Sequence, residues 1–341
     1  MLGAGPCPDA ACYGAKMTTV ISRKISALPG AIAESAKVLA DGGLVAFPTE
    51  TVYGLGADAT NGQAVAGIFA AKGRPRFNPL IVHVASPEDA ARYGEFSAKA
   101  LQLAKAFWPG ALTLVLPRRA DTRLSHLVSA GLDTVALRVP SHAVARQLLH
   151  LSGRPIAAPS ANVSGSVSAT TAAHVLESLN GKIDFILDGG PTMLGLESTV
   201  IGFENNRPIL LRPGAIPRED IEALVGALAA SDDTIRSPGQ MESHYAPHAA
   251  LRLNAAAARP GEKLLGFGDV PGASRNLSPR GDLKEAAANL FAMLRELDKD
   301  AGLIAVSPIP QTGLGEAIND RLRRAAAPRT EQCAATPRNW P

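Results

Sequence analysis

Three segments of the sequence combine cations, hydroxyls and amides in patterns that suit an anionic ligand. The first, at 47–84, reads FPTETVYGLGADATNGQAVAGIFAAKGRPRFNPLIVHV. Within it Lys72, Arg74 and Arg76 follow the expected end of a helix, so a short loop presents three cations. Such groups could hold a triphosphate, each charged contact contributing about 1.5 to 3 kcal/mol. They could instead complement the helix carboxyl end, worth about 0.3 to 1 kcal/mol, and taken alone the loop favours this second role.

The second segment is a predicted strand, TVALRV at 134–139, in which alternate side chains face opposite ways. Its three apolar residues share one face, which leaves Arg138 on the other. An unpaired buried charge is costly, so Arg138 should meet an anion, either a ligand or an acidic side chain. His83 is similarly placed in the predicted strand at 80–84, where a structural role is the commoner outcome.

The third segment, AAPSANVSGSVSAT at 157–170, follows a short apolar strand and precedes a predicted helix. Its polar groups can cap that helix or bind phosphate and ribose, and capping needs only one or two of them. Ser198 and Arg212 add polar groups at the ends of later strands, where ligand sites of α/β sheets tend to lie. The polar residues of the third segment are Ser160, Asn162, Ser164, Ser166, Ser168 and Thr170.

Familiar catalytic and nucleotide motifs are missing from the sequence. It contains no GxxxxGK[ST], and Gly54-Leu55-Gly56 does not complete GxGxxG. GxSxG and HExxH are also absent. His244 and His248 have metal-ligand spacing, but Pro247 breaks the helical face that this spacing needs, so no metal site is expected. A nucleotide site in this chain must therefore use side chains.

The composition is that of a globular protein with two cores. The chain has 341 residues, of which 46% are hydrophobic and 19% charged. A net charge of +3 gives no general basic field for nucleic acid. Cys7, Cys12 and Cys333 lie near the termini, a pattern that suits a reducing compartment. With no apolar run approaching the roughly 18 residues of a membrane span, we expect a cytoplasmic protein without a membrane partner.

Hydrophobic periodicity predicts an α/β domain on a twisted mixed sheet, followed by a smaller βαβα unit. The predicted organisation is an extension at 1–16, a first domain at 17–230, a linker at 231–248, a second domain at 249–328 and a tail at 329–341. First-domain strands are predicted at 44–47, 80–84, 112–116, 135–139, 156–158, 185–187, 200–203 and 209–211, and helices at 31–40, 63–72, 98–107, 143–151, 172–179 and 219–228. The second domain has predicted strands at 263–267 and 303–306 and helices at 283–297 and 316–324.

A local basic cluster occupies the carboxyl end of the chain. We interpret it as a solvated helix end and a loose tail, with an RNA contact as the alternative. Its members are Arg321, Arg323, Arg324, Arg329 and Arg338.

In order along the chain, these segments resemble the YrdC-like domain of threonylcarbamoyl-AMP synthases. The resemblance covers about 25–228 and implies the YrdC-like mixed sheet with flanking helices. HYAP at His244 and the segment 289–326 resemble the linker and the smaller, Rossmann-like carboxyl-terminal domain of two-domain members. The matching motifs are FPTETVYGLG at Phe47, K-x-R at Lys72, NPLIVHV at Asn78, WPG at Trp108, S-x-N at Ser160, ESTV at Glu197 and LRPG at Leu211.

The resemblance implies ATP-dependent synthesis of L-threonylcarbamoyl-adenylate from L-threonine, bicarbonate and ATP, with release of pyrophosphate. The product would pass to a tRNA threonylcarbamoyl-transferase complex that modifies the adenosine following the anticodon. Mg²⁺ is expected to accompany ATP. Glu50 and Glu197 could assist this ion, although a structural role is the favoured alternative for both residues. Threonine contacts carry over to Thr51, His83, Arg138, Ala158 and Ser198. ATP contacts carry over to Lys72, Arg74, Asn78, Thr134, Ser160, Asn162, Ser168, Arg212 and Tyr245.

Two other functions stay open from the sequence. A non-catalytic RNA-binding protein could use the same domain, and its RNA affinity would be strongly salt-dependent. A carbamoyl-transfer enzyme of related fold would need further catalytic domains, which this sequence lacks.

Overall fold

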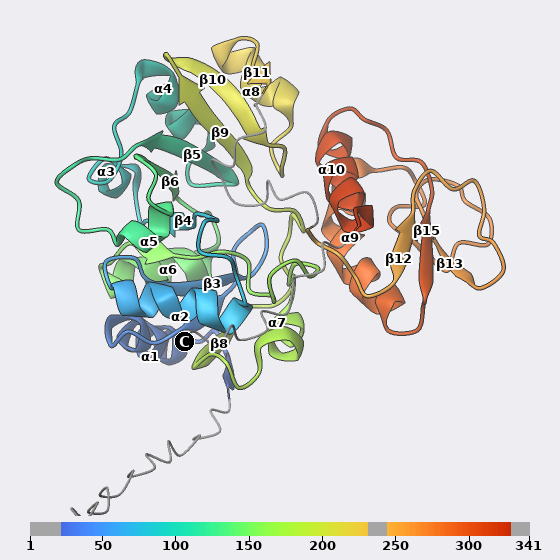
Figure 1. Ribbon diagram of the computed structural model, residues 1–341, viewed down its shortest axis with the longest axis horizontal. Coiled ribbons are helices and arrows are strands. Elements are labelled where there is room, and N and C mark those ends of the chain that lie inside the picture. The colour runs from blue at the N-terminus through green and yellow to red at the C-terminus, as the bar shows by residue number, and fades with distance from the viewer. Residues whose placement is uncertain (1–21, 231–243, 329–341) are drawn as a thin grey trace, which may run out of the picture.

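The chain forms two α/β domains, each built on its own sheet (Figure 1). A computed structural model describes residues 22–230 and 244–328. The predicted extension, the tail, most of the predicted linker and the three cysteines lie outside these residues. The predicted domain boundaries, several of which fall at these gaps, stay predictions.

The first domain contains a large sheet with helices packed around it. Its strands are β1 (Arg23–Ser26), β2 (Val45–Phe47), β3 (Gly54–Asp58), β4 (Ile81–His83), β5 (Leu112–Pro117), β6 (Thr134–Arg138), β7 (Ile156–Ala157), β8 (Phe185–Asp188), β9 (Thr199–Glu204), β10 (Arg207–Arg212) and β11 (Ala229–Ala230). Its helices are α1 (Pro29–Ala40), α2 (Gly62–Lys72), α3 (Pro87–Ala90), α4 (Ala98–Phe107), α5 (His126–Ser129), α6 (Ala143–Ser152), α7 (Ala172–Leu179) and α8 (Arg218–Val225).

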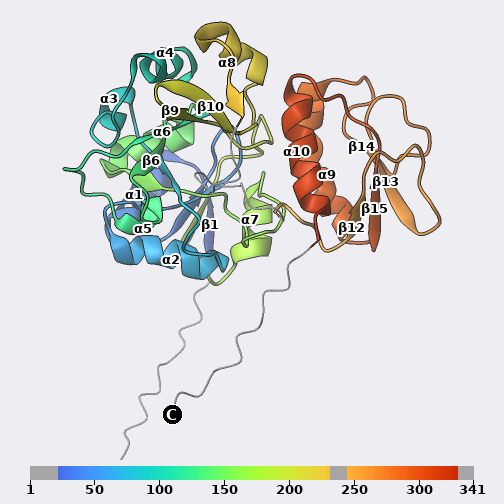
Figure 2. The same cartoon turned by 45° about the horizontal axis from the view of Figure 1, so that its top comes forward.

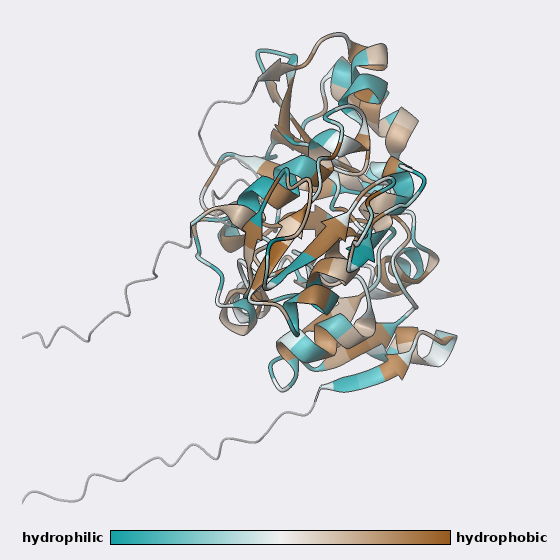
Figure 3. Cartoon of the chain, turned by 90° about the vertical axis from the view of Figure 1, so that its right-hand side faces the viewer, coloured by the Kyte–Doolittle hydropathy of each residue, from teal (hydrophilic) through white to brown (hydrophobic). Residues whose placement is uncertain are grey.

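The strand order of this sheet is β1-β8-β2-β3-β7-β4-β6-β5-β9-β10-β11. The sheet contains both parallel pairs, such as β4 with β6, and antiparallel pairs, such as β5 with β6. The predicted mixed sheet with flanking helices is thereby confirmed. Figure 3 shows the apolar strands at the centre of the molecule, with more hydrophilic helix surfaces outside them.

The two faces of the central strands have different surroundings. Val82 and Leu137 point into the main core, which also receives apolar side chains of α2 and α4. The opposite face carries Ala136 within a smaller apolar cluster. On that face the strands end at His83 and Arg138, which are paired across β4 and β6. The end of these two strands is therefore where the site begins.

Capping fixes the helix that leads into the cationic loop. The Asn61 side chain accepts hydrogen bonds from the amides of Gln63 and Ala64 and begins α2. Gly73 ends the helix with a left-handed φ of 60°, which glycine adopts without strain. Lys72 and Arg74 thus lie on either side of a sharp change in chain direction.

The predicted helices and strands are present with small shifts in their ends, and several short elements were missed. β3 is the main omission, because Gly54 and Gly56 have low strand propensity. A Cβ on Gly56 would lie 2.8 Å from Cε1 of Phe47 and 2.9 Å from Cγ2 of Ile156. Glycine is therefore required here by close packing between neighbouring strands, which no local pattern reveals.

The second domain is a parallel sheet with two helices on one side. Its strands are β12 (Ala250–Arg252), β13 (Glu262–Gly266), β14 (Arg275–Asn276) and β15 (Leu303–Val306), and its helices are α9 (Leu283–Asp298) and α10 (Leu314–Ala326). The strand order is β12-β15-β13-β14. Figure 2 shows both helices on the side of this sheet that faces the first domain. The predicted smaller α/β domain is confirmed, and no helix of the described residues is long and apolar enough to cross a membrane.

Candidate functional site

A cavity lies where the ends of β4 and β6 meet the polar segments and the residues His244 and Tyr245, which lead into the second domain. All five predicted threonine contacts line it, as do four of the predicted ATP contacts, Arg74, Ser160, Arg212 and Tyr245. Side chains far apart in the sequence are thus brought to one place. The lining residues are Thr49, Thr51, Val52, Gly54, Arg74, Ile81, His83, Arg138, Ala158, Pro159, Ser160, Glu197, Ser198, Arg212, His244 and Tyr245.

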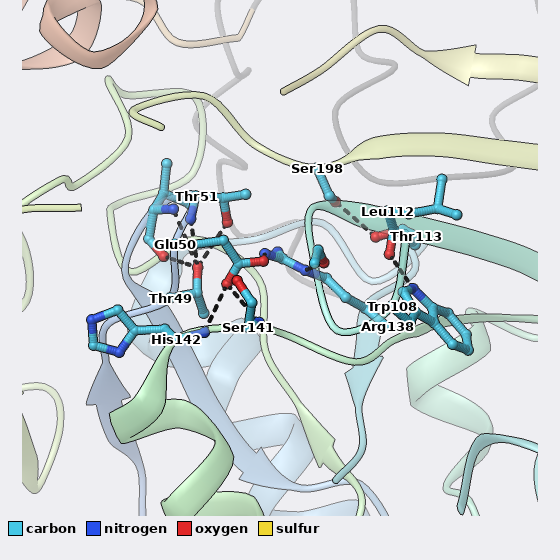
Figure 4. A network of polar contacts seen from close by, with 12 residues as sticks. Thr49, Glu50, Thr51, Trp108, Leu112, Thr113, Arg138, Ser141, His142 and Ser198 are labelled. Atoms are coloured by element: carbon cyan, nitrogen blue, oxygen red, sulfur yellow. Dashed lines mark hydrogen bonds and ion pairs between the residues drawn. The ribbon is translucent and has the colours of Figure 1, made fainter. Parts of the chain in front are cut away.

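A buried ion pair orients Arg138 (Figure 4). Its Nη2 lies 2.7 Å from Oε1 of Glu50, and its Nε donates to the Gly110 carbonyl at 3.2 Å. Oε2 of Glu50 accepts from the amides of Ser141 and His142. Burial raises the pKa of Glu50, but Arg138 and these amides outweigh it and lower the pKa. Nη1 of Arg138 makes no hydrogen bond to the described residues, and Arg138 lines the cavity, so Nη1 is available to a ligand carboxylate.

Hydroxyl groups surround the Arg138 guanidinium. Thr51 Oγ1 lies 2.7 Å from Thr49 Oγ1, and Ser198 Oγ lies 2.7 Å from Thr113 Oγ1. Our reading of the sequence missed Thr49 and Thr113. Strand alternation could have suggested Thr113, which shares a face of β5 with Val115. Thr49 follows the end of β2, and its signal was its place two residues before Thr51 in FPTETVYGLG.

His83 is buried beside this pair and is not a fully satisfied core histidine. Its ring meets Phe47 edge-on, with ring centroids 6.3 Å apart. Nδ1 of His83 has no hydrogen-bond partner among the described residues. Burial, and then Arg138, lower the pKa of His83 to about 3, so the folded protein holds the neutral ring. A neutral imidazole in the cavity can exchange one hydrogen bond with a polar ligand.

Acid is expected to destabilise the fold partly through His83. The pKa of His83 is 6.5 in the unperturbed side chain and about 3 in the folded protein. Its contribution to the free energy of unfolding is therefore present above pH 6.5 and is lost as the pH falls towards 3. We expect the free energy of unfolding, measured with urea, to fall less from neutral to acidic pH in the His83→Asn variant than in the unchanged protein. His150→Asn, which changes an exposed histidine of α6, is the control. Identical pH slopes for all three proteins would contradict this role.

Three buried cations form the other half of the site. Lys72 Nζ donates to the carbonyls of Ser160, at 2.6 Å, and Asn162. Arg74 Nη2 donates to the Pro79 carbonyl at 2.8 Å, and Arg212 Nη2 donates to the Ser198 carbonyl at 2.8 Å. These contacts orient the cations through main-chain oxygens. Arg76 differs, because it is exposed, so the loop presents two cations to the interior and not three.

The charges of these cations are opposed by their surroundings. Burial lowers the pKa of Lys72 well below its usual value, and Arg74 lowers it further. Burial, and then Arg212, lower the pKa of Arg74 to about 10. The pKa of Arg212 is lowered as well, again mainly by burial. A polyanion bound among these side chains would relieve both the burial cost and the mutual repulsion.

Four predicted ATP residues besides Lys72 lie outside the cavity lining. Asn162 Nδ2 donates to the carbonyls of Val163 and Ser166, each at 2.8 Å, which braces the loop. Ser168 Oγ donates to Glu197 Oε1 at 2.5 Å. Asn78 is buried, and its carbonyl accepts from Arg74 Nε at 3.2 Å.

Thr134 lies at the far end of β6 in an apolar groove. The groove is separate from the cavity, but both open on the same face of the sheet, because Thr134 and Arg138 are an even number of residues apart. Its lining includes Val115, Ile209 and Leu211.

Among the described members of the carboxyl-terminal basic cluster, Arg323 is exposed, as predicted for a solvated helix end, but Arg321 is not. Arg321, on α10, is 0% exposed, and its Nε lies 2.8 Å from Glu197 Oε2. Arg324 pairs with Asp320 at 3.0 Å. For Arg321 the prediction was wrong. The amphipathic pattern of α10 identifies the apolar face of this helix, but it cannot show that an arginine on the helix contacts a residue of the first domain. Arg329 and Arg338 lie outside the described residues.

Comparisons with known proteins agree with this geometry. A family model described as telomere recombination matches residues 37–214, and one described as the threonylcarbamoyl-AMP synthase C-terminal domain matches 216–327. The threonylcarbamoyl-AMP synthase of Pyrococcus abyssi is 42% identical over 335 residues, covering 91% of this chain and 98% of the relative. This chain belongs to the two-domain threonylcarbamoyl-AMP synthases. The predicted family and enzyme class are confirmed.

Further relatives show the same domain arrangement. The threonylcarbamoyl-AMP synthase of Bacillus subtilis is 43% identical over 326 residues, covering 87% of this chain and 93% of the relative. A crystal structure of P. abyssi Sua5 complexed with L-threonine superposes with a TM-score of 0.82, at 41% identity over 91% of this chain and 98% of that one. The assignment of individual residues of this synthase to threonine or ATP stays a prediction.

Proposed function

We propose that this chain condenses L-threonine, bicarbonate and ATP to L-threonylcarbamoyl-adenylate and releases pyrophosphate. The observation that carries the proposal is a single cavity with two different halves. One half contains Arg138 together with the hydroxyl residues Thr51 and Ser198, a set that suits an amino-acid carboxylate. The other contains Arg74 and Arg212, and Lys72 contacts the main-chain carbonyl of Ser160, which also lines this half. The lowered pKa values of these three cations favour a polyanionic ligand.

The reaction needs alignment and charge neutralisation more than a protein base. Bicarbonate and the neutral threonine amine form a carbamate with loss of water. One carbamate oxygen then attacks the α-phosphorus as the bond to pyrophosphate breaks. Arg138 would fix the carboxylate, while the cations would neutralise charge on the departing phosphates. Positioning two reactants in this way can supply roughly 7 to 11 kcal/mol in favourable cases.

We place the adenine base in the apolar groove at Thr134. The groove lies on the same sheet face as the cavity, and Arg138 is four residue steps along β6 from Thr134, a distance of about 13 Å. Val115, Ile209 and Leu211 offer the apolar surface that an aromatic base prefers. Tyr245, which lines the cavity just before the second domain begins, would contact the phosphates or the ribose.

We propose that Mg²⁺ binds together with ATP, chiefly through phosphate oxygens and water. No group of three or more His, Cys, Asp or Glu side chains in residues 22–230 and 244–328 could hold a metal ion. Glu50 and Glu197 are already held by Arg138 and Arg321. The bound ion would supply further neutralisation of phosphate charge, and the buried cations would share that task.

The same proposal covers the later fate of the product. We propose that threonylcarbamoyl-adenylate passes to a tRNA threonylcarbamoyl-transferase complex, for modification of the adenosine next to the anticodon. This use requires access to tRNA and supports a cytoplasmic location. Direct tRNA contact by this chain is not needed for the reaction.

Pyrophosphate release tests the reaction directly. Incubation of the chain with ATP, L-threonine and bicarbonate should release pyrophosphate, and omission of threonine should abolish that release. Release that does not depend on threonine would contradict the proposal. No release, together with salt-sensitive RNA binding, would instead support a non-catalytic RNA-binding protein.

A further inference from the structure

Arg321 is a fully buried arginine that the second domain places beside the cavity. It lies on α10, the helix that faces the first domain in Figure 2. Its Nε lies 2.8 Å from Oε2 of Glu197, and its Nη2 donates to the Pro213 carbonyl at 3.0 Å. Its guanidinium also lies over the ring of Tyr245, 5.0 Å from the centroid. One planar group therefore contacts three segments that border the site.

Two of the residues that Arg321 contacts are next to residues of the site in the sequence. Glu197 precedes Ser198, and Pro213 follows Arg212. Arg212 donates to the Ser198 carbonyl from Nε at 3.3 Å and from Nη2 at 2.8 Å. Arg321 thus holds the beginning of β9 and the end of β10 at the point where Arg212 and Ser198 are in contact.

Close backbone packing makes this arrangement rigid. A Cβ on Gly214 would lie 2.5 Å from the Glu197 carbonyl oxygen and from the Thr199 amide nitrogen, so the two segments touch with no side chain between them. Ala215 donates its amide to the Glu197 carbonyl at 3.0 Å. A shift of the Glu197 carboxylate would therefore be transmitted to the chain that carries Arg212.

Charge favours the same arrangement. Burial opposes the charge of Arg321, but Tyr245, Glu197 and Asp320 outweigh burial and raise its pKa. The pKa of Glu197 is lowered, because Arg321 and Arg212 outweigh the effect of burial. Both partners stay ionised, so the pair is held by a strong, directional contact.

We propose that Arg321 is a positioning residue for the nucleotide half of the site. Through Glu197 and the Pro213 carbonyl it sets the placement of Arg212, so docking of the second domain is needed for tight ATP binding. This inference rests on the proposed function, since it assumes that Arg212 contacts ATP.

Steady-state kinetics with Arg321→Gln test the inference. We expect KM for ATP to rise about tenfold, as for one misplaced charged contact, while KM for threonine stays nearly unchanged. Glu197→Gln should raise KM for ATP similarly, and the double variant should be little worse than either single variant, since the two residues act as one unit.

Arg218→Gln is the matched control for domain docking. Arg218 pairs with Glu316 of α10 at 2.5 Å across the same interface, but it does not line the cavity. We expect this variant to keep the original KM for ATP. An equal rise in the control, equal changes in the two substrate KM values, or additive effects of Arg321→Gln and Glu197→Gln would overturn the inference.

Arg321→Lys provides a second test if Arg321→Gln does not fold. Lysine keeps the buried charge but cannot contact both Glu197 and Pro213 with one planar group, so KM for ATP should still rise. An unchanged KM for ATP would overturn this inference and leave the proposed function standing. If the unmodified chain shows no threonine-dependent pyrophosphate release, the proposed function fails first and the inference fails with it.

Discussion

Replacement of Arg138 by alanine should weaken L-threonine binding by about 100-fold or more and leave ATP binding nearly unchanged. The guanidinium is buried, is oriented by Glu50 and Gly110, and belongs to a residue that lines the cavity, with Nη1 not bonded to the described residues. Loss of a charge-assisted contact to the threonine carboxylate accounts for an effect of that size. Isothermal titration calorimetry with each ligand measures both affinities.

Stability must be separated from binding in this experiment. Removing Arg138 leaves Glu50 buried without its cation, and breaking a buried pair costs about 3 to 5 kcal/mol. Glu50→Gln breaks the same pair but keeps the guanidinium, so it is the matched control. We expect both variants to melt at a lower temperature and only Arg138→Ala to lose most threonine binding. Similar losses for threonine and ATP in Arg138→Ala would contradict the assignment.

Replacement of Arg74 by alanine should have the reverse effect. We expect ATP binding to weaken by about 100-fold and threonine binding to stay nearly unchanged. Arg74 lines the cavity and is held by the carbonyls of Asn78 and Pro79. Burial and Arg212 oppose its charge in the absence of an anion, so a triphosphate gains from the contact without having to displace a carboxylate partner. Calorimetric titration with ATP measures the loss.

Arg76→Ala is the matched control for Arg74→Ala. It removes an arginine from the same loop, but Arg76 is exposed. Its contribution to ATP binding should be small, because exposed charges are screened by water and salt. If the two variants lose ATP affinity to the same extent, then general loop charge and not the buried contact is responsible.

Part of the site was predicted because its chemistry is local. Lys72 ends a helix and Arg74 follows it, and the stop at Gly73 between them is visible in the sequence. Arg138 lies on the strand face opposite an apolar one. The partners of these residues were not predictable in the same way. Glu50 lies 88 positions from Arg138, and the sequence left an acidic side chain and a ligand as equal alternatives. In the structure Glu50 takes Nη2 and leaves Nη1 for a ligand.

The sequence by itself determined the family, the mixed α/β fold and most of the residues that line the cavity. These follow from hydrophobic periodicity and from motifs in a fixed order, both of which are properties of neighbouring residues. Only the tertiary structure decided that Arg76 is exposed, that the glycines of β3 form a strand, and that Arg321 contacts Glu197 from 124 positions away. Burial and long-range pairing depend on how the two domains pack, and periodicity along one helix or strand carries no information about that packing.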